Sequence, residues 1–209
     1  MSDVMYPEVM IIGSGAVRVA TVGDSLTYGY GLENRERDAY PSILATKLGH
    51  HYQVFNFGLS GRSLQSTSDY PYLQERNAQL SLESEADIVI IMIGTNDSRA
   101  PYWNKERFIK EYGELVDRYL QMSSQPDVYL LVPPYVPTSR FGLNNDIVRT
   151  ELQEIIPRIA EDRGLEWINL YSLTEGRLEC YSDGLHLTPF GNQLVAEMVY
   201  AKIMGESLR

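Results

Sequence analysis

The sequence is poor in the features that mark disulfide-rich, membrane-spanning and nucleic-acid-binding proteins. Only one of its 209 residues, Cys180, is cysteine, which excludes an internal disulfide and a zinc site built from cysteines. No apolar run approaches the roughly 18 residues that span a bilayer, so we expect no membrane insertion. Positive charge is scarce, with 18 Lys and Arg against 28 Asp and Glu and a net charge of −10. This negative field opposes binding to nucleic acid or an anionic membrane, so we expect neither as a partner.

The amino-terminal residues lack the basic start and long apolar core of a signal peptide. Residues 9–12 are apolar, but this stretch is short and follows an acidic one. We therefore expect a cytoplasmic location, although a removed signal stays open. The whole chain, residues 1–209, is expected to form one domain, with residues 1–16 as an N-terminal extension.

A dinucleotide-binding fingerprint is not completed in the first part of the chain. Gly13 and Gly15 have the spacing of its first two glycines, but Arg18 stands where the third would be. We expect a tight turn here, and neither a cofactor nor a metal ion.

Short apolar segments alternate along the chain with longer segments of helical periodicity. Strands are expected at residues 17–22, 52–57, 87–93, 128–132 and 165–170. Helices are expected at about residues 40–48, 72–84, 105–122, 145–163 and from residue 188 almost to the C-terminus. Pro157 should kink or shorten the fourth of these helices. The alternation predicts a doubly wound α/β domain, in which helices cover both faces of a mainly parallel sheet.

Three of the expected strands end in glycine-containing turns that carry polar side chains. The turns read Gly-Asp-Ser-Leu at 23–26, Gly-Leu-Ser-Gly at 58–61 and Gly-Thr-Asn-Asp at 94–97. Open α/β sheets bind their ligands at the carboxyl ends of strands, so Ser25 could be a nucleophile as well as a turn-forming residue. A serine nucleophile needs a base that removes its proton.

His186 is the one histidine of three that is expected at the same edge of the sheet. His50 and His51 lie in the connection leading into the second strand, which places them at the opposite, amino edge. Three residues before His186 stands Asp183, whose carboxylate could hold the Nδ1 proton of the imidazole. A turn cap explains Asp183 as well, so the pair alone leaves both interpretations open.

Two of the strand-end turns could also donate hydrogen bonds to the oxyanion that develops during acyl transfer. Glycine lets the backbone approach a ligand closely, so the Gly58 N–H could point into a site. Asn96 offers an uncharged side-chain amide donor. Ordinary turn formation explains each residue equally well.

Taken together, these segments resemble the SGNH hydrolases of the GDSL lipase/esterase superfamily. The matching blocks are residues 23–26, residues 56–58 with 60–61, residues 94–97 and residues 183–186. The resemblance implies a flavodoxin-like three-layer α/β/α sandwich around a mainly parallel five-stranded sheet. It also implies a serine esterase that works through an acyl-enzyme without a metal ion.

The resemblance assigns a role to individual residues. It implies that Ser25 is the nucleophile, His186 the base and Asp183 the carboxylate that orients the base. It further implies an oxyanion hole made of the Ser25 and Gly58 backbone amides and the Asn96 side chain. Asp24 precedes Ser25 and Asp97 follows Asn96. Both are expected to hold these residues in position without contacting the substrate.

Aromatic and basic side chains occur in several loops expected near this edge. The candidates for substrate contact are Tyr28, Tyr30, Arg62, Tyr102, Trp103 and Tyr135. Aromatic faces could stack on a sugar or line an acyl groove, although packing within the loops explains them as well. Residues 91–98, followed by Tyr102 and Trp103, are similar to relatives that act on acetylated carbohydrates.

The expected partner is a small-molecule ester, and an O-acetyl ester of a carbohydrate is the first hypothesis. Lysophospholipase and acyl thioesterase activities remain alternatives within the same family. A non-catalytic ligand-binding domain or a flavin-binding protein are alternatives outside it, and assembly into a homo-oligomer stays open.

Overall fold

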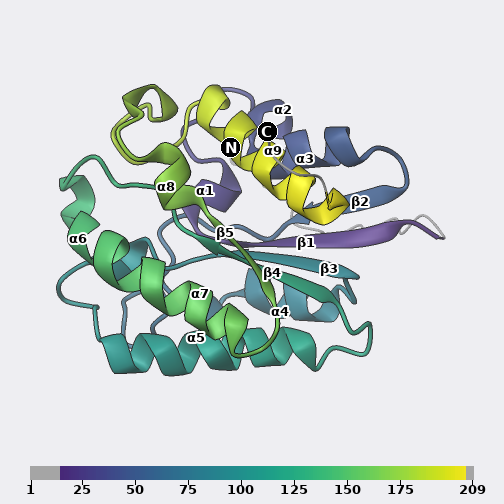
Figure 1. Ribbon diagram of the computed structural model, residues 1–209, viewed down its shortest axis with the longest axis horizontal. Coiled ribbons are helices and arrows are strands. Elements are labelled where there is room, and N and C mark those ends of the chain that lie inside the picture. Colours follow the sequence, from purple (N-terminus) through teal and green to yellow (C-terminus); the bar gives the residue numbers. More distant parts are fainter. Residues whose placement is uncertain (1–14, 206–209) are drawn as a thin grey trace.

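The computed structural model describes residues 15–205, which form a parallel sheet with helices on both sides (Figure 1). The strands are β1 (Val17–Gly23), β2 (Tyr52–Asn56), β3 (Ile88–Met92), β4 (Asp127–Val132) and β5 (Glu166–Asn169). They pair in the order β2-β1-β3-β4-β5, and every pair is parallel. The predicted α/β/α sandwich is confirmed. The expected turn at Gly13 and nearly all of the expected N-terminal extension lie outside the described residues.

Five longer helices cover the sheet. They are α3 (Tyr40–Leu48), α4 (Arg76–Glu83), α5 (Lys105–Leu120), α7 (Gln153–Glu161) and α9 (Pro189–Met204). The shorter helices and single turns are α1 (Ser25–Tyr28), α2 (Arg35–Asp38), α6 (Asn145–Ile147), α8 (Leu170–Thr174), η1 (Tyr72–Gln74), η2 (Asn96–Ser98), η3 (Arg140–Gly142), η4 (Val148–Leu152) and η5 (Leu178–Cys180). Within residues 15–205 no helix has the length and apolar character needed to cross a bilayer.

Two expected helices are less regular than their periodicity indicates. The segment at 72–84 is divided at Glu75, which has extended backbone angles, into η1 and α4. The segment at 145–163 passes through the π-helical turn η4 before α7 begins. Pro157 lies inside α7 and cannot donate the usual hydrogen bond to the carbonyl of Gln153. The irregular turn ends directly before Gln153, so the helix departs from α geometry ahead of the proline rather than ending at it.

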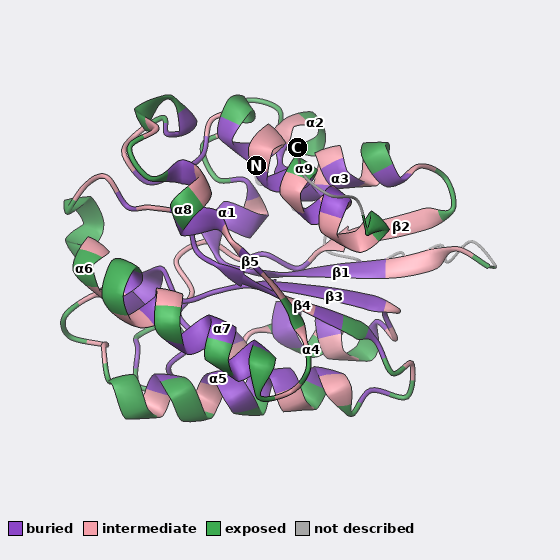
Figure 2. Cartoon of the chain, viewed as in Figure 1, coloured by how far each residue is buried: buried purple, intermediate pink, exposed green. Residues whose placement is uncertain are grey.

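Strand β3 lies at the centre of the molecule and contributes to two hydrophobic cores. All five of its residues are buried, as expected for a strand covered on both faces. Val89 and Ile91 face the core formed with α4, α5 and α7, whereas Ile88, Ile90 and Met92 face the core formed with α3 and α9. Figure 2 shows burial concentrated on β3 and on most of β1 and β4, and on the helix surfaces that face the sheet, whereas β2 is only partly buried.

The order of the strands indicates at which edge of the sheet a ligand would bind. From β1 the chain first adds β2 on one side and then β3 on the other, so the direction of winding reverses between β1 and β3. In open α/β sheets the ligand crevice lies outside the carboxyl ends of the strands at this reversal. His50 and His51 precede β2 at the opposite edge, as expected, with ring centroids 4.0 Å apart.

Candidate active site

Ser25 is the first residue of the one-turn helix α1, directly after β1. The preceding residue, Asp24, caps this turn, because its carboxylate accepts a hydrogen bond from the Leu26 N–H at 3.0 Å. Glycine is required at position 23, since a Cβ there would lie 2.2 Å from the Met92 carbonyl oxygen. Ser25 is 6% exposed, and its hydroxyl has no hydrogen-bond partner among residues 15–205. The turn therefore presents an unengaged hydroxyl at the end of β1.

Asn96 connects the turn after β3 with the turns after β1 and β2. The residue is buried and begins η2. Its side-chain amide donates to the Arg62 carbonyl oxygen at 3.0 Å and to Asp24 Oδ2 at 3.4 Å. The first bond is of ordinary length, while the second is long and correspondingly weak. The Asn96 amide is thus held firmly by one N–H and loosely by the other.

Asp97 fastens the segment after β2 to the end of β3. It is fully buried, and its two carboxylate oxygens accept hydrogen bonds from the Leu64 and Gln65 N–H groups, both at 2.8 Å. These bonds join residues more than thirty positions apart. Asp97 therefore fixes the loop that follows β2. Its expected support of the reacting groups remains a prediction.

Burial changes the ionisation of both aspartates in these turns. It raises the pKa of Asp24 to about 7, an effect that the nearby charge of Asp97 increases and that of Arg99 reduces. Burial likewise raises the pKa of Asp97 to about 7, against the lowering effect of its backbone hydrogen bonds. Near neutral pH each carboxyl group is therefore close to the midpoint of its titration.

The Gly58 N–H is already engaged within the protein. It donates to Asn56 Oδ1 at 2.9 Å, and the Asn56 amide in turn donates to the Thr27 carbonyl oxygen at 2.9 Å. A Cβ on Gly58 would lie 2.4 Å from the backbone nitrogen of Tyr28. Glycine at this position thus permits close packing between the turns after β1 and β2. The asparagine two residues earlier is the sequence signal for such a local bond.

Gly61, three residues further along the same turn, has the opposite character. Its φ angle is 77°, and a Cβ built on it would meet no atom within 4 Å. No hydrogen bond among the described residues uses its N–H. The N–H of Gly61 is therefore an unengaged backbone donor of this turn, whereas the N–H of Gly58, the glycine expected from the sequence to donate, is engaged.

Asp183 and His186 lie in a small loop between η5 and α9. An antiparallel bridge between Tyr181 and Leu187 closes the base of this loop. Asp183 Oδ2 is 2.7 Å from His186 Nδ1, while Asp183 Oδ1 accepts hydrogen bonds from the N–H groups of His186 at 2.8 Å and Leu185 at 3.0 Å. The carboxylate therefore binds both the ring and the backbone of the same histidine.

The ionisation of Asp183 is suited to this contact. Burial acts to raise its pKa, but the hydrogen bonds from the His186 ring and backbone outweigh burial, so the pKa lies below its ordinary value. Asp183 is thus ionised at neutral pH. It fixes the tautomer that carries a proton on Nδ1, which leaves Nε2 of the imidazole as a proton acceptor.

The loop that follows Ser25 packs against His186. The Tyr30 N–H donates to the Ser25 carbonyl oxygen at 3.0 Å, and the Tyr30 ring centroid lies 4.5 Å from that of His186. No hydrogen bond joins the Ser25 hydroxyl to His186 among residues 15–205, and such bonds are often long before substrate binds. The structure brings Ser25, Asn96 and the Asp183–His186 pair to the carboxyl edge of the sheet.

Phe141 also contacts His186, at 6.0 Å between ring centroids, and was not expected from the sequence. It lies in η3, within the long connection between β4 and α6. An aromatic residue in a long loop gives no periodic signal, so only the three-dimensional structure reveals this contact.

Of the six residues expected to contact substrate, Tyr30 is the one whose ring packs on His186. The other five have partners of their own: Tyr28 with Arg35, Arg62 with Glu75, Tyr102 with Asp69, Trp103 with Phe108 and Tyr135 with Tyr171. Their roles in substrate binding remain predictions.

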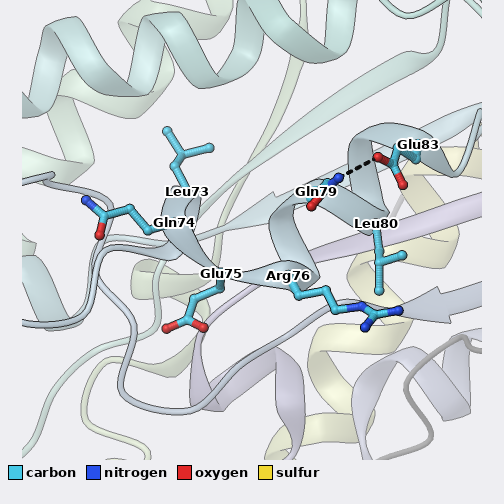
Figure 3. Close-up of a pocket in the computed structure, with 7 residues that line it drawn as sticks. All are labelled: Leu73, Gln74, Glu75, Arg76, Gln79, Leu80 and Glu83. Carbon is cyan, nitrogen blue, oxygen red and sulfur yellow. Dashed lines mark hydrogen bonds between the residues drawn. The ribbon is translucent and has the colours of Figure 1, made fainter.

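A hollow away from these residues lies on the surface of η1 and α4, and Figure 3 shows the residues that line it. They are Leu73, Gln74, Glu75, Arg76, Gln79, Leu80 and Glu83. The lining contains neither a nucleophile nor a histidine, and Glu75 within it holds Arg62 through a 2.9 Å ion pair. Among the residues that the structure describes, no three His, Cys, Asp or Glu side chains are grouped to hold a metal ion.

Comparisons with known proteins identify the family of the chain and relatives of its fold. The model of the GDSL-like lipase/acylhydrolase family matches residues 21–194, which contain every site residue described above. An acetylxylan esterase of Xylanibacter ruminicola is 29% identical over 208 residues, covering 90% of this chain and 43% of the relative. The chain thus spans less than half the length of that relative.

Solved structures share the fold at low sequence identity. Est24, a carbohydrate acetylesterase from Sinorhizobium meliloti, has a TM-score of 0.74 at 22% identity, covering 90% of this chain and 98% of that one. The M. smegmatis aryl esterase has a TM-score of 0.74 at 20% identity, covering 92% of this chain and 100% of that one. These likenesses support the three-layer architecture.

Proposed function

Because the chain belongs to the GDSL-like lipase/acylhydrolase family, we propose that it is a serine carboxylic ester hydrolase that removes acetyl groups from carbohydrate. The observation that carries this proposal is the Asp183–His186 pair, with its 2.7 Å contact, beside the turn that presents Ser25. A non-catalytic ligand-binding domain would need neither an imidazole oriented by a carboxylate nor an unengaged serine hydroxyl at the same edge of the sheet.

In the proposed reaction the Ser25 hydroxyl attacks the ester carbonyl carbon while His186 Nε2 accepts its proton. The ionised Asp183 holds the Nδ1 proton and stabilises the imidazolium that forms. His186 then protonates the leaving alcohol, and an acyl-enzyme remains on Ser25. Water enters by the same route, with His186 again as base, and releases the carboxylic acid.

The oxyanion of each tetrahedral intermediate needs donors that are already in place. The Ser25 N–H and the Asn96 amide are the first two, and the long contact from Asn96 to Asp24 leaves one amide N–H available for a better acceptor. The Gly58 N–H would first have to leave Asn56, whereas the Gly61 N–H has no partner to lose. We therefore assign the third donor to Gly61.

The choice of an acetylated carbohydrate rests on likeness. The acetylxylan esterase relative and the structure of Est24 both support it, while lysophospholipase and thioesterase activities remain the alternatives. The relative is more than twice as long as this chain, so its name alone does not define the substrate. The proposed preference for acetyl over longer acyl groups therefore needs a direct test.

The proposed function is tested by an acyl series on the wild type and on Ser25→Ala. We expect the wild type to hydrolyse p-nitrophenyl acetate and acetylated xylobiose faster than the palmitoyl ester, and to be labelled by a fluorophosphonate. Ser25→Ala should lose hydrolysis and labelling, while the control Ser66→Ala, at an exposed serine, keeps both. Labelling that persists in Ser25→Ala would refute the assignment of the nucleophile.

A further inference from the structure

The imidazole of His186 is flanked by two aromatic rings that are themselves open to solvent. Tyr30 is 51% exposed and its ring is tilted by 45° against the imidazole, while Phe141 is 48% exposed and meets it nearly edge-on at 61°. His186 itself is only 7% exposed. The two rings therefore form the accessible surface around the buried imidazole.

The backbone at Phe141 is unfavourable for an aromatic residue. Its φ angle is 64°, in the left-handed region that favours glycine. The loop is held there by contacts to the segment that carries His186: the Arg140 guanidinium donates to the Asp183 carbonyl oxygen at 3.5 Å, and Thr138 packs over Gly184. An exposed apolar ring in a strained conformation gains little from folding, which is typical of residues kept for binding.

The direction of proton transfer decides which part of an ester these rings would touch. In the proposed reaction His186 gives its proton to the oxygen of the leaving alcohol. That oxygen must therefore lie beside the imidazole, and the groups bonded to it extend over whatever surrounds the imidazole. The acyl group, in contrast, is bonded to the carbonyl carbon attacked by Ser25, and the carbonyl oxygen on that carbon points towards the donors of the strand-end turns.

We propose that Tyr30 and Phe141 form the subsite for the alcohol part of the substrate, and that this part is a saturated ring such as a pyranose. The proposal rests on the proposed function. Aromatic faces bind the apolar C–H face of a sugar ring and leave its hydroxyl groups free for polar neighbours. Arg140, whose guanidinium lies 5.4 Å from the Phe141 ring centroid, brings hydrogen-bond donors to the same place.

The chain offers a matched control for Phe141. Phe190 is 45% exposed and has the Arg177 guanidinium 5.3 Å from its ring centroid, an arrangement close to that of Phe141 and Arg140. In the part of the chain that the structure describes, however, Phe190 makes no ring contact with His186. Replacing Phe190 thus removes a similar ring from outside the proposed subsite.

The test compares esters that share an acetyl group and differ in the alcohol. Phe141→Asn removes the ring and keeps a residue that tolerates positive φ, so the loop should persist. We expect it to raise KM for acetylated methyl xyloside about fivefold with kcat nearly unchanged, and to leave ethyl acetate hydrolysis unaffected. Tyr30→Ala should act in the same direction, whereas Phe190→Ala should alter neither substrate.

A second series keeps p-nitrophenol as the alcohol and lengthens the acyl group from acetyl to butyryl. The ratio of the two rates should be the same in wild type and Phe141→Asn. A changed ratio, or an equal loss on ethyl acetate and the xyloside ester, would overturn the alcohol subsite while the esterase function stands. If the wild type hydrolyses no ester at all, the proposed function fails, and this inference fails with it.

Discussion

The two parts of the candidate site are built in different ways. The strand-end turns around Ser25 are linked across the sheet edge by buried hydrogen bonds, in which Asn96 and Asp97 connect segments more than thirty residues apart. The loops around His186 are linked mainly to themselves, and they expose Asp183, Tyr30 and Phe141 in part. One part has its geometry fixed by the core of the protein, and the other by local contacts.

This difference matches the demands of the proposed reaction. An oxyanion hole works only when its donors are fixed before the charge develops, which suits a network that the sheet holds rigid. In the proposed reaction, His186 and the surface around it must accept alcohols of varied shape. Loops that are held mainly by hydrogen bonds within themselves suit this role. We therefore expect substitutions in the outer loops to affect activity alone, and some substitutions in the strand-end turns to affect stability as well.

The largest effect is expected from Asp183→Asn. Asparagine offers the His186 ring no negative charge and permits the wrong tautomer, so kcat should fall by roughly a thousandfold to ten-thousandfold. The melting temperature should change little, because the side chain is 30% exposed and its partners are local. Steady-state kinetics and thermal unfolding measure both quantities. Asp146→Asn, which affects only an exposed ion pair with Arg149, is the control and should retain full activity.

Asn96→Ala should follow, with kcat reduced by about a hundredfold or more, as for the loss of a single oxyanion donor. KM should remain within about threefold of the wild type, because the donor acts on charge that develops after binding. Initial rates on p-nitrophenyl acetate test this. A loss of kcat below about threefold would remove Asn96 from the oxyanion hole.

Asp97→Ala tests whether the hydrogen bonds between the strand-end turns stabilise the fold. It leaves the Leu64 and Gln65 N–H groups without their acceptors, and we expect the free energy of unfolding to fall by about 2 kcal/mol. Denaturant unfolding gives this value directly. A variant as stable as the wild type would contradict the view that this network fixes the turns, whatever happens to its activity.

The smallest effect is a dependence of stability on pH. Asp24 and Asp97 titrate near 7 in the folded protein and near the ordinary value of 3.8 when unfolded. Between these values the folded state binds more protons, so its stability falls as the pH rises from about 4 to about 7. We expect the melting temperature to be lower at pH 8 than at pH 5.

The expected pH dependence can be assigned to Asp24 and Asp97 rather than to Asp183. The pKa of Asp183 is shifted downward, so its effect on stability has the opposite sign but is confined to pH values below its ordinary range. Asp24→Asn keeps an oxygen that can cap α1 and should weaken the dependence above pH 5. A melting temperature that rises from pH 5 to pH 8 would show that these carboxyl groups are not buried in their neutral form.

The sequence predicts most of the fold because the sheet is simple. The central strands β1, β3 and β4 are mainly apolar, the edge strands β2 and β5 are short and mixed, and a parallel sheet needs only such segments separated by helices. The irregular turn η4 and the break at Glu75 were not predictable, since both depend on how a helix meets its neighbours rather than on its own periodicity. The cytoplasmic location and the oligomeric state remain predictions.

The candidate site was predictable where residues are close in sequence or follow a strand directly. Asp183 and His186, three positions apart, and Ser25, at the end of β1, are of this kind. The distinction between Gly58 and Gly61 needed the hydrogen bonds of the turn, because both are glycines after the same strand. Phe141 became visible only when a distant loop was placed against His186.

The bridge between Tyr181 and Leu187 has a consequence for how the site can vary during thermal motion. Because it closes the loop behind Asp183 and His186, any displacement of the loop carries the acid and the base together, and their 2.7 Å contact is preserved. The bridge does not fix the position of His186 relative to Ser25, which lies on a separate turn after β1. In the proposed reaction, the pairing of Asp183 with His186 is therefore built into one loop, and the approach of His186 to Ser25 is set separately.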